Sequence, residues 1–266
     1  MGVPTLSEAA ALPAPDARAG DGAGGTEGQL ASTRLRRAAV AARLVVTAGC
    51  WLLVLTQLVW LLQWSWHLLD NADLTWDYSI YYQPWYLVAH GHLLPRNTME
   101  GGYLFLRNDG ELIVYLLAPL YWLFPNHELG YLWLQDLAIA GVSATCLRLV
   151  IEQVPWNTSA RWRSQGVAGA ARALAVLLLV ANPFVYWTAS FDIHMEVFGA
   201  FFAVLTLRAG LQGRRSTVVW AVLTAMCGAP SALNVVGIGI ALAVVAAWRA
   251  RRQPRRQVAN AAIRPL

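Results

Sequence analysis

The segment SFDIHMEVF holds three ionisable side chains between two apolar stretches: Asp192, His194 and Glu196. Two carboxylates and an imidazole are donors that divalent metal ions accept, so this group is the candidate metal site of the chain. On one helix, however, Asp192 and Glu196 share a face while His194 points away from it. A single helix therefore does not complete a three-ligand site. A metal site, a polar cavity and a bare turn between helices stay open, and we favour the cavity.

Asp77 is the candidate catalytic residue. It lies in the stretch WDYSIYYQPWYLVAHG, whose mixture of aromatic and polar residues is typical of an amphipathic helix in the membrane interface. An Asp at a helix start can cap free backbone N–H groups. A carboxylate at the membrane surface can also activate a hydroxyl group or hold a metal ion. Both interpretations stay open.

Asp109 and Glu111 form a third, weaker acidic pair in front of an apolar segment. Either they line a cavity or a lipid-phosphate site, or they belong to a solvated loop. Gln83, which follows Asp77 on the same amphipathic stretch, is a further candidate for contact with substrate or lipid phosphate.

The elements that must position these residues are membrane-spanning helices. Hydrophobic residues make up 57% of the 266-residue chain and charged residues 13%, whereas soluble domains carry about 25% charged residues. The apolar residues gather in runs long enough to cross a bilayer. We predict spans at 44–64, 129–150, 170–189 and 195–211, and a helical hairpin over 216–248 that is broken at Gly228-Ala229-Pro230.

Segment 111–125 is too short for a comfortable crossing, since 15 residues of helix reach only about 22 Å. It is either a short span or a second interfacial or re-entrant helix, and we predict the second. The fold class expected is therefore all-α: a polytopic integral membrane protein with about six transmembrane helices and two interfacial helices in its first outer loop.

Charge supports this topology. All 20 basic residues are Arg, and with six crossings all but Arg96 and Arg107 fall on one side, which the positive-inside rule makes cytoplasmic. Most of the 15 acidic residues then face the other side. We read the net charge of +5 as topological rather than as a sign of nucleic-acid binding. Both termini are expected in the cytoplasm, with a disordered tail over 1–33, a transmembrane domain over 34–250 whose outer loop is 67–128, and a basic tail over 251–266.

Three blocks of the sequence resemble a bacterial membrane-protein family, the domain-of-unknown-function 2079 family. They are WDYSIYYQPWYLVAHGHLL, YLLAPLYWLFP with the following pair Leu134-Gln135, and SFDIHMEVFGAFF. That family is similar to the C-type glycosyltransferases, polytopic enzymes that take sugars from polyprenyl-phosphate carriers at the outer face of the membrane. The resemblance implies that Asp77 is the essential acid and that helices at 77–90 and 111–125 lie along the membrane surface.

The chain departs from the family pattern in three places. Asp109 stands where the family usually has a His, Cys227-Gly228-Ala229 stands where a charged group is often found, and members are commonly longer. The chain is thus expected to be an amino-terminal half, a degenerate member, or one subunit of a pair.

Three functions follow, in this order. The first is a glycosyltransferase-like protein of the bacterial cytoplasmic membrane that uses a polyprenyl-phosphate-linked sugar, with a divalent metal ion as the candidate cofactor. The second is a non-catalytic subunit that binds the lipid carrier or assists assembly, together with a second membrane subunit. The third is a small transporter, for which midplane acids on broken helices would be expected. Membrane lipid is a partner in every case, and nucleic acid in none.

Overall fold

A computed structural model of the chain describes residues 24–107, 110–153, 162–190 and 193–252. Residues 1–42 and 43–266 form two compact units. The first helix, α1 (Gly24–Asp70), begins in the first unit, so residues 24–33, which we predicted to be a disordered tail, are helical. Glu27, Gln29, Leu30 and Ala31 in this stretch have high helix propensity, and the helix continues from them without a break into the apolar segment that follows.

Four helical segments in the described part of the chain are long and apolar enough to cross a membrane. The chain is therefore an all-α integral membrane protein, as its composition predicts. The segments are Arg37–Asp70, His127–Gln153, Gly166–Ser190 and Ala229–Arg251. Two further helices of the predicted bundle, Met195–Leu211 with 17 residues and Ser216–Ala225 with 10, are shorter than these four segments. The count of six crossings therefore stays a prediction.

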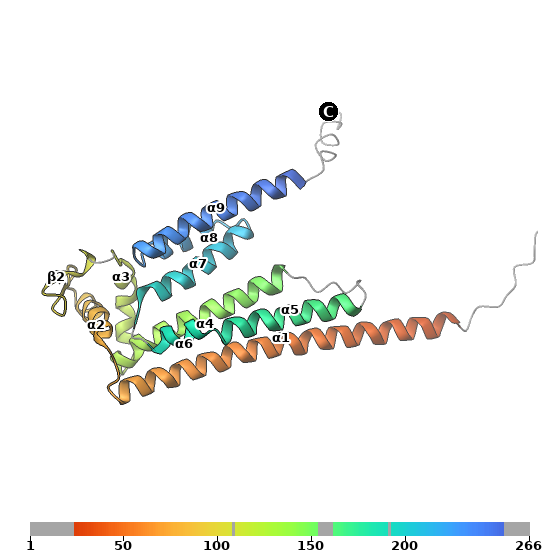
Figure 1. Cartoon of the computed structure of the whole chain (residues 1–266), viewed down its shortest axis with the longest axis horizontal. Coiled ribbons are helices and arrows are strands. Elements are labelled where there is room, and N and C mark those ends of the chain that lie inside the picture. The colour runs from red at the N-terminus through yellow and green to blue at the C-terminus, as the bar shows by residue number, and fades with distance from the viewer. Residues whose placement is uncertain (1–23, 108–109, 154–161, 191–192, 253–266) are drawn as a thin grey trace, which may run out of the picture. The chain divides into compact units, whose positions relative to one another are not determined.

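In the second unit, helices run side by side from α4 to α9 (Figure 1). In chain order they are α4 (His127–Gln153), α5 (Trp162–Val180), α6 (Pro183–Ser190), α7 (Met195–Leu211), α8 (Ser216–Ala225) and α9 (Ala229–Arg252). Helix α7 packs against α4, α8 and α9. The predicted hairpin break is confirmed, because α8 ends and α9 begins around Gly228, whose φ of 105° is a left-handed value that suits glycine.

One break was not predicted. The segment expected as a single span at 170–189 consists of α5 and α6, which meet at Ala181-Asn182-Pro183. Pro183 has no backbone N–H, so the helical hydrogen bond to the carbonyl of Leu179 cannot form, and the helix is interrupted there.

One end of the bundle carries the segment predicted as the first outer loop, for which we keep the name outer loop. It consists of α2 (Trp76–Ala89), a two-stranded antiparallel hairpin, and a short apolar helix in two parts. The hairpin strands are β1 (Arg96–Asn97) and β2 (Tyr103–Leu104), and a 3-10 turn, η1 (Phe105–Arg107), follows them. The apolar helix is α3 (Ile113–Leu117), continued by the 3-10 helix η2 (Ala118–Leu123). Pro119 lies at the start of η2, where proline ends regular α-helix.

Buried aromatic packing holds the loop helices on the bundle. Trp85 of α2 is fully buried, stacks on Tyr131 of α4 at 4.3 Å between ring centres, and donates its indole N–H to the carbonyl of Leu117 at 2.8 Å. The backbone N–H of Ile113 donates to the carbonyl of Met226 in the turn between α8 and α9, at 2.9 Å. The helices predicted at 77–90 and 111–125 thus lie together on the end of the bundle.

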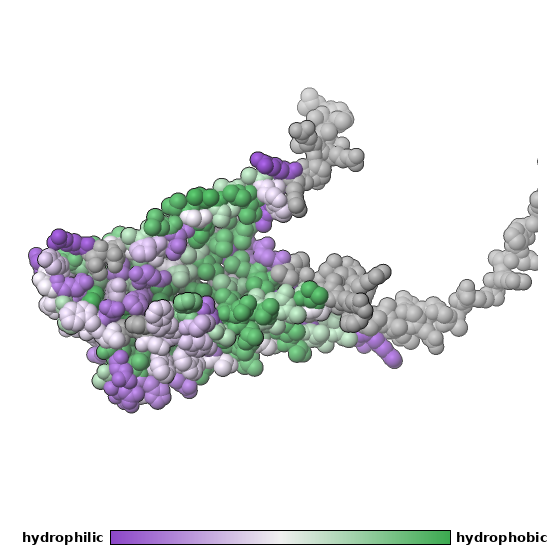
Figure 2. All heavy atoms as spheres, in the orientation of Figure 1, coloured by the Kyte–Doolittle hydropathy of each residue, from purple (hydrophilic) through white to green (hydrophobic). Residues whose placement is uncertain are grey.

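Hydrophilic residues gather over α2 and the hairpin, and hydrophobic residues cover the long helices (Figure 2). We call the first end the acidic end, because Asp70, Asp73, Asp77, Glu111, Glu128 and Glu196 lie there. The other end of α7, α8 and α9 is the basic end, with Arg208, Arg214, Arg215, Arg249 and Arg251. An apolar middle between two charged ends is what a bilayer requires of a spanning bundle.

Close packing of α7 on α9 depends on Gly199. A Cβ at this position would lie 2.8 Å from the Cβ of Ser231 and 3.2 Å from the Cβ of Cys227, and rotation of these side chains cannot move either atom away. A substitution there must push the two helices apart.

Gly199→Ala is therefore expected to lower the free energy of unfolding by about 1–3 kcal/mol, the usual cost of overpacking. The matched control is Gly239→Ala on α9, where a Cβ would meet no atom within 4 Å. Thermal unfolding of both variants in lipid nanodiscs measures the effect. Equal melting temperatures for the two variants would show that α7 and α9 do not pack as described.

Candidate functional site

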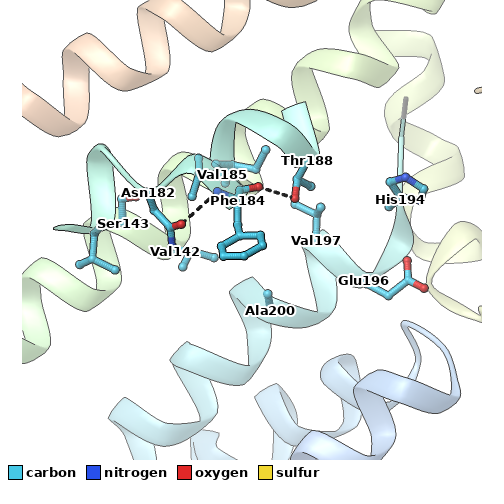
Figure 3. A pocket seen from close by; sticks show the side chains of 12 residues that line it. Val142, Ser143, Asn182, Phe184, Val185, Thr188, His194, Glu196, Val197 and Ala200 are labelled. Carbon is cyan, nitrogen blue, oxygen red and sulfur yellow. Dashed lines mark hydrogen bonds between the residues drawn. The ribbon is translucent and has the colours of Figure 1, made fainter. Parts of the chain in front are cut away.

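A cavity of about 480 Å³ lies between α4, α5, α6 and α7. Its middle is apolar, formed by Ile139, Val142, Leu179, Phe184, Val185, Val197 and Ala200. His194 and Glu196 lie at one end, and Ser143 and Asn182 lie at the opposite end (Figure 3). The cavity is a groove rather than a closed chamber, because Phe184 on its rim is 67% exposed. We call it the α4–α7 groove.

The end of the groove at His194 and Glu196, which we call its mouth, is built at the start of α7. His194 is the N-cap residue of α7, in extended conformation, and its backbone N–H donates to the side-chain oxygen of Gln135 at 2.8 Å. Gln135 is buried on α4, so this hydrogen bond fixes the first residues of α7 against the bundle. Glu196 follows in the first turn, and its Oε2 atom is buried without a hydrogen-bond partner in the described part of the chain.

The opposite end of the groove, at Ser143 and Asn182, is built by the break between α5 and α6. The side-chain oxygen of Asn182 accepts a hydrogen bond from the backbone N–H of Phe184 at 3.0 Å and so begins α6. Gln135 and Ser143 are eight residues apart on α4, so the two ends of the groove are separated by about 12 Å. Both ends are polar, and the wall between them is apolar except for Thr188, whose hydroxyl donates to the carbonyl of Phe184 at 2.8 Å.

Asp77 lies in the first turn of α2 and is half-buried. The N-cap of α2 is Thr75, so Asp77 is inside the helix rather than its cap. No donor in the described part of the chain bonds to its carboxylate. Tyr81, one turn later on the same face, has its ring 6.1 Å from that of His194. Asp77 is therefore about one helical turn, roughly 5 Å, from Tyr81, which lies beside His194 at the mouth of the groove.

Glu111 is completely buried at the same end of the bundle. Its carboxylate lies near the hydroxyl of Tyr131 and near the thiol of Cys227, which also has Glu196 nearby. Tyr131 donates in turn to the carbonyl of Tyr81 at 3.2 Å. The structure thus brings Glu111 and Glu196 to the same thiol at the start of α7, although they come from distant parts of the sequence.

Gln83 lies apart from these residues and contacts the hairpin. Its side-chain oxygen accepts hydrogen bonds from the backbone N–H and the hydroxyl of Thr98, at 3.0 and 3.1 Å, and so ties the hairpin to α2. Asn97 beside it is fully buried and donates to the carbonyl of Ile80 at 3.2 Å. Gln83 and Asn97 therefore position the hairpin over α2.

The two remaining candidates, Asp109 and Asp192, lie outside the described residues. Among the residues that the structure does describe, no group of three His, Cys, Asp or Glu side chains could hold a metal ion. The metal site of Asp192, His194 and Glu196 stays a prediction from the sequence.

Two tyrosines of the outer loop are partly buried. Burial raises the pKa of the Tyr82 hydroxyl, and the nearby Glu128 carboxylate and Tyr121 raise it further, because each disfavours a second negative charge. Burial also raises the pKa of the Tyr115 hydroxyl. The Tyr115 hydroxyl acts as a hydrogen-bond donor to the carbonyl of Leu93 at 2.6 Å.

Sequence reasoning missed several residues of the groove. Ser143, Asn182 and Tyr81 were not candidates, because a lone hydroxyl or amide in an apolar run carries no signal of what it faces. The dipeptide Asn182-Pro183 was a usable signal, since such pairs mark breaks in helices.

Gln135→Leu tests how α7 is positioned. The variant leaves the backbone N–H of His194 without its buried acceptor, so we expect a loss of about 1–3 kcal/mol in the free energy of unfolding. Gln63→Leu is the control, because Gln63 is exposed on α1. Thermal unfolding in nanodiscs checks the difference, and an unchanged melting temperature for Gln135→Leu would contradict the role of this hydrogen bond.

Comparison with known proteins identifies a family and no closer relative. A family model described as "Predicted membrane protein (DUF2079)" matches residues 66–263, which include α2, the hairpin and the whole α4–α7 groove. No curated protein matches the chain, and no solved structure matches it. The matched region covers well over half of the sequence and contains the three blocks that resemble this family. The chain belongs to the DUF2079 family of membrane proteins.

Proposed function

We propose that this protein is a membrane glycosyltransferase-like protein that uses a polyprenyl-phosphate-linked sugar at its acidic end. The observation that supports this most is the α4–α7 groove, which has hydrocarbon walls at membrane depth and ionisable groups at its mouth. A polyprenyl phosphate has the matching distribution, with an apolar chain and a charged head. Membership of a membrane-protein family is compatible with such a substrate.

The walls of the groove suit an isoprenoid chain. Ile139, Val185 and Val197 offer branched apolar side chains along its length. Each CH₂ group moved from water into such a site gains about 0.8 kcal/mol, although a chain that comes from lipid gains mainly the packing contacts. The phosphate would lie at the mouth, where His194 can donate a hydrogen bond to it. Arg96 and Arg107 of the neighbouring hairpin region supply positive charge at the same end.

Asp77 would act on the acceptor. In this step its carboxylate takes the proton from an acceptor hydroxyl, whose oxygen attacks the anomeric carbon of the sugar. A new glycosidic C–O bond forms while the C–O bond to phosphate breaks. The polyprenyl phosphate leaves with the electron pair of that bond, and its charge is stabilised at the mouth of the groove. A divalent metal ion, if held by Asp192, His194 and Glu196, would stabilise the charge of this leaving group.

A second function remains, in which the groove binds the lipid carrier and no transfer takes place. It is favoured by the turn at Cys227-Gly228-Ala229, which carries no charged side chain close to Glu111 and Glu196. In that case a second membrane subunit would supply the catalytic groups.

Two variants separate these functions. Asp77→Asn is expected to lower sugar transfer by at least about 100-fold, the range for loss of a general base, and to leave lipid binding unchanged. Ala200→Trp fills the groove and is expected to weaken polyprenyl-phosphate binding at least tenfold. The controls are Asp73→Asn, an exposed acid before α2, and Val218→Trp on the exposed face of α8.

Binding is measured by native mass spectrometry of nanodiscs that contain polyprenyl phosphate, and transfer by incorporation of label from polyprenyl-phosphate sugars. Full transfer by Asp77→Asn removes Asp77 from the reaction. Lipid binding without transfer by the wild-type chain supports the second function. Equal binding by Ala200→Trp and the wild type would rule out the groove for both.

The proposal also requires a defined orientation in the membrane, with the acidic end outside and both termini in the cytoplasm. In a background without Cys50, Cys146 and Cys227, single cysteines at Asp73 and Glu128 are expected to react with a membrane-impermeant thiol reagent in intact cells. Cysteines at Gln153 and Gln212 should react only after the membrane is opened. All four positions are exposed in the structure, so lack of reaction reports sidedness rather than burial. The opposite labelling pattern would place the groove mouth in the cytoplasm and contradict the proposal.

A further inference from the structure

Helix α9 has an exposed seam that borders its contact with α7. Along it, exposed residues recur at alternating spacings of three and four: Asn234, Gly237, Ala241 and Val244. The contacts of α9 with α7 are made through other residues, since Ser231 meets Gly199 and Leu242 meets Gly210 of α7. The hydrophobic surface of α9 is open in Figure 2, and its position above α7 and α8 can be followed in Figure 1. Spacing of this kind is the pattern by which two helices pack along their length.

Asn234 is the polar residue of this seam, and it lies at membrane depth. The guanidinium of Arg249 donates to the carbonyl of Leu211 at 3.2 Å, which sets the basic end of α9 level with the end of α7. Asn234 precedes Arg249 by 15 residues, or about 22 Å of helix. It therefore lies inside a hydrocarbon layer about 30 Å thick. No hydrogen bond to its side chain is found within the described residues, and lipid offers none.

The surface around Asn234 is shaped for a close neighbour. A groove of about 360 Å³ runs beside it, lined by Ala203, Val204 and Leu207 of α7 and by residues of α9. A Cβ on Gly237 would meet no atom within 4 Å, so the backbone of α9 is open to contact there. Gly237 and Ala241 are four residues apart, the small-residue spacing at which membrane helices approach closely.

The chemistry of the amide selects the partner. An Asn side chain has a donor and an acceptor, so two of them related by a two-fold axis satisfy each other. The partner must also present its amide about 22 Å from its own basic end. A second copy of this chain in the same orientation meets both conditions by construction. A single Asn in an otherwise apolar seam is also a known determinant of register and of two-stranded assembly.

We propose that two copies of this protein associate through α9, with the Asn234 side chains hydrogen-bonded to each other across a two-fold axis and Gly237 at the closest approach. None of the seam residues lines the α4–α7 groove, so this interface does not depend on the proposed enzymatic function.

Cysteine cross-linking of the full chain tests this interface. In the background without Cys50, Cys146 and Cys227, a cysteine at Ala241 on the seam is expected to form a disulfide between copies in native membranes under mild oxidation. A cysteine at Ala243, on the opposite side of α9, is the matched control and should not. Adding Asn234→Leu or Gly237→Leu to the Ala241→Cys chain should lower the cross-linked dimer at least tenfold, while Gly239→Leu should leave it unchanged.

The result is checked by counting fluorophores per spot in dilute lipid vesicles, where the wild-type chain should bleach in two steps and Gly237→Leu in one. Asn234, Gly237 and Gly239 are exposed, so their substitution should not unfold the monomer, and thermal unfolding confirms this. Equal cross-linking at Ala241 and Ala243, no effect of Asn234→Leu, or cross-linking of Ala241→Cys to a protein of different mass would each overturn the proposal.

Discussion

Helices α4 and α7 are joined by hydrogen bonds at both ends of the bundle, and the rest of the site is arranged around that pair. At the acidic end, Gln135 of α4 accepts the backbone N–H of His194. At the basic end, Glu152 of α4 accepts from Arg208 at 2.5 Å and from Gln212 at 2.7 Å. Between these points the contacts are apolar, because hydrocarbon offers no partner to a polar group. The relative height and rotation of the two helices are therefore set where polar groups can be satisfied.

This arrangement explains why the groove is polar only at its ends. The start of α7 and the break between α5 and α6 are the two places where backbone groups leave regular helix and must find other partners. His194 finds Gln135, and Phe184 finds the side chain of Asn182. These breaks also place helix starts beside the groove, and the first turn of α7 brings Glu196 into its lining.

A second buried polar contact joins the bundle to α1. Ser65 donates to the carboxylate of Asp136 at 2.7 Å, one residue beyond Gln135 on α4. A carboxyl group at this depth is costly unless another group bonds to it. Adjacent residues on α4 thus point to different neighbours, Gln135 to α7 and Asp136 to α1, and α4 is the helix through which the two sides of the bundle are held together.

Periodicity, length and charge in the sequence were enough to predict the membrane class, the helix pair of the outer loop and the hairpin at Gly228, because each depends on local composition. The family blocks likewise lie within the sequence itself. Tertiary structure alone decided that Glu111 is buried near Glu196, that Gln83 holds the hairpin, and that Asn182 and Ser143 complete a groove with His194. These facts depend on which helix faces which neighbour across the bundle, and an apolar run looks the same on every face until its partners are in place.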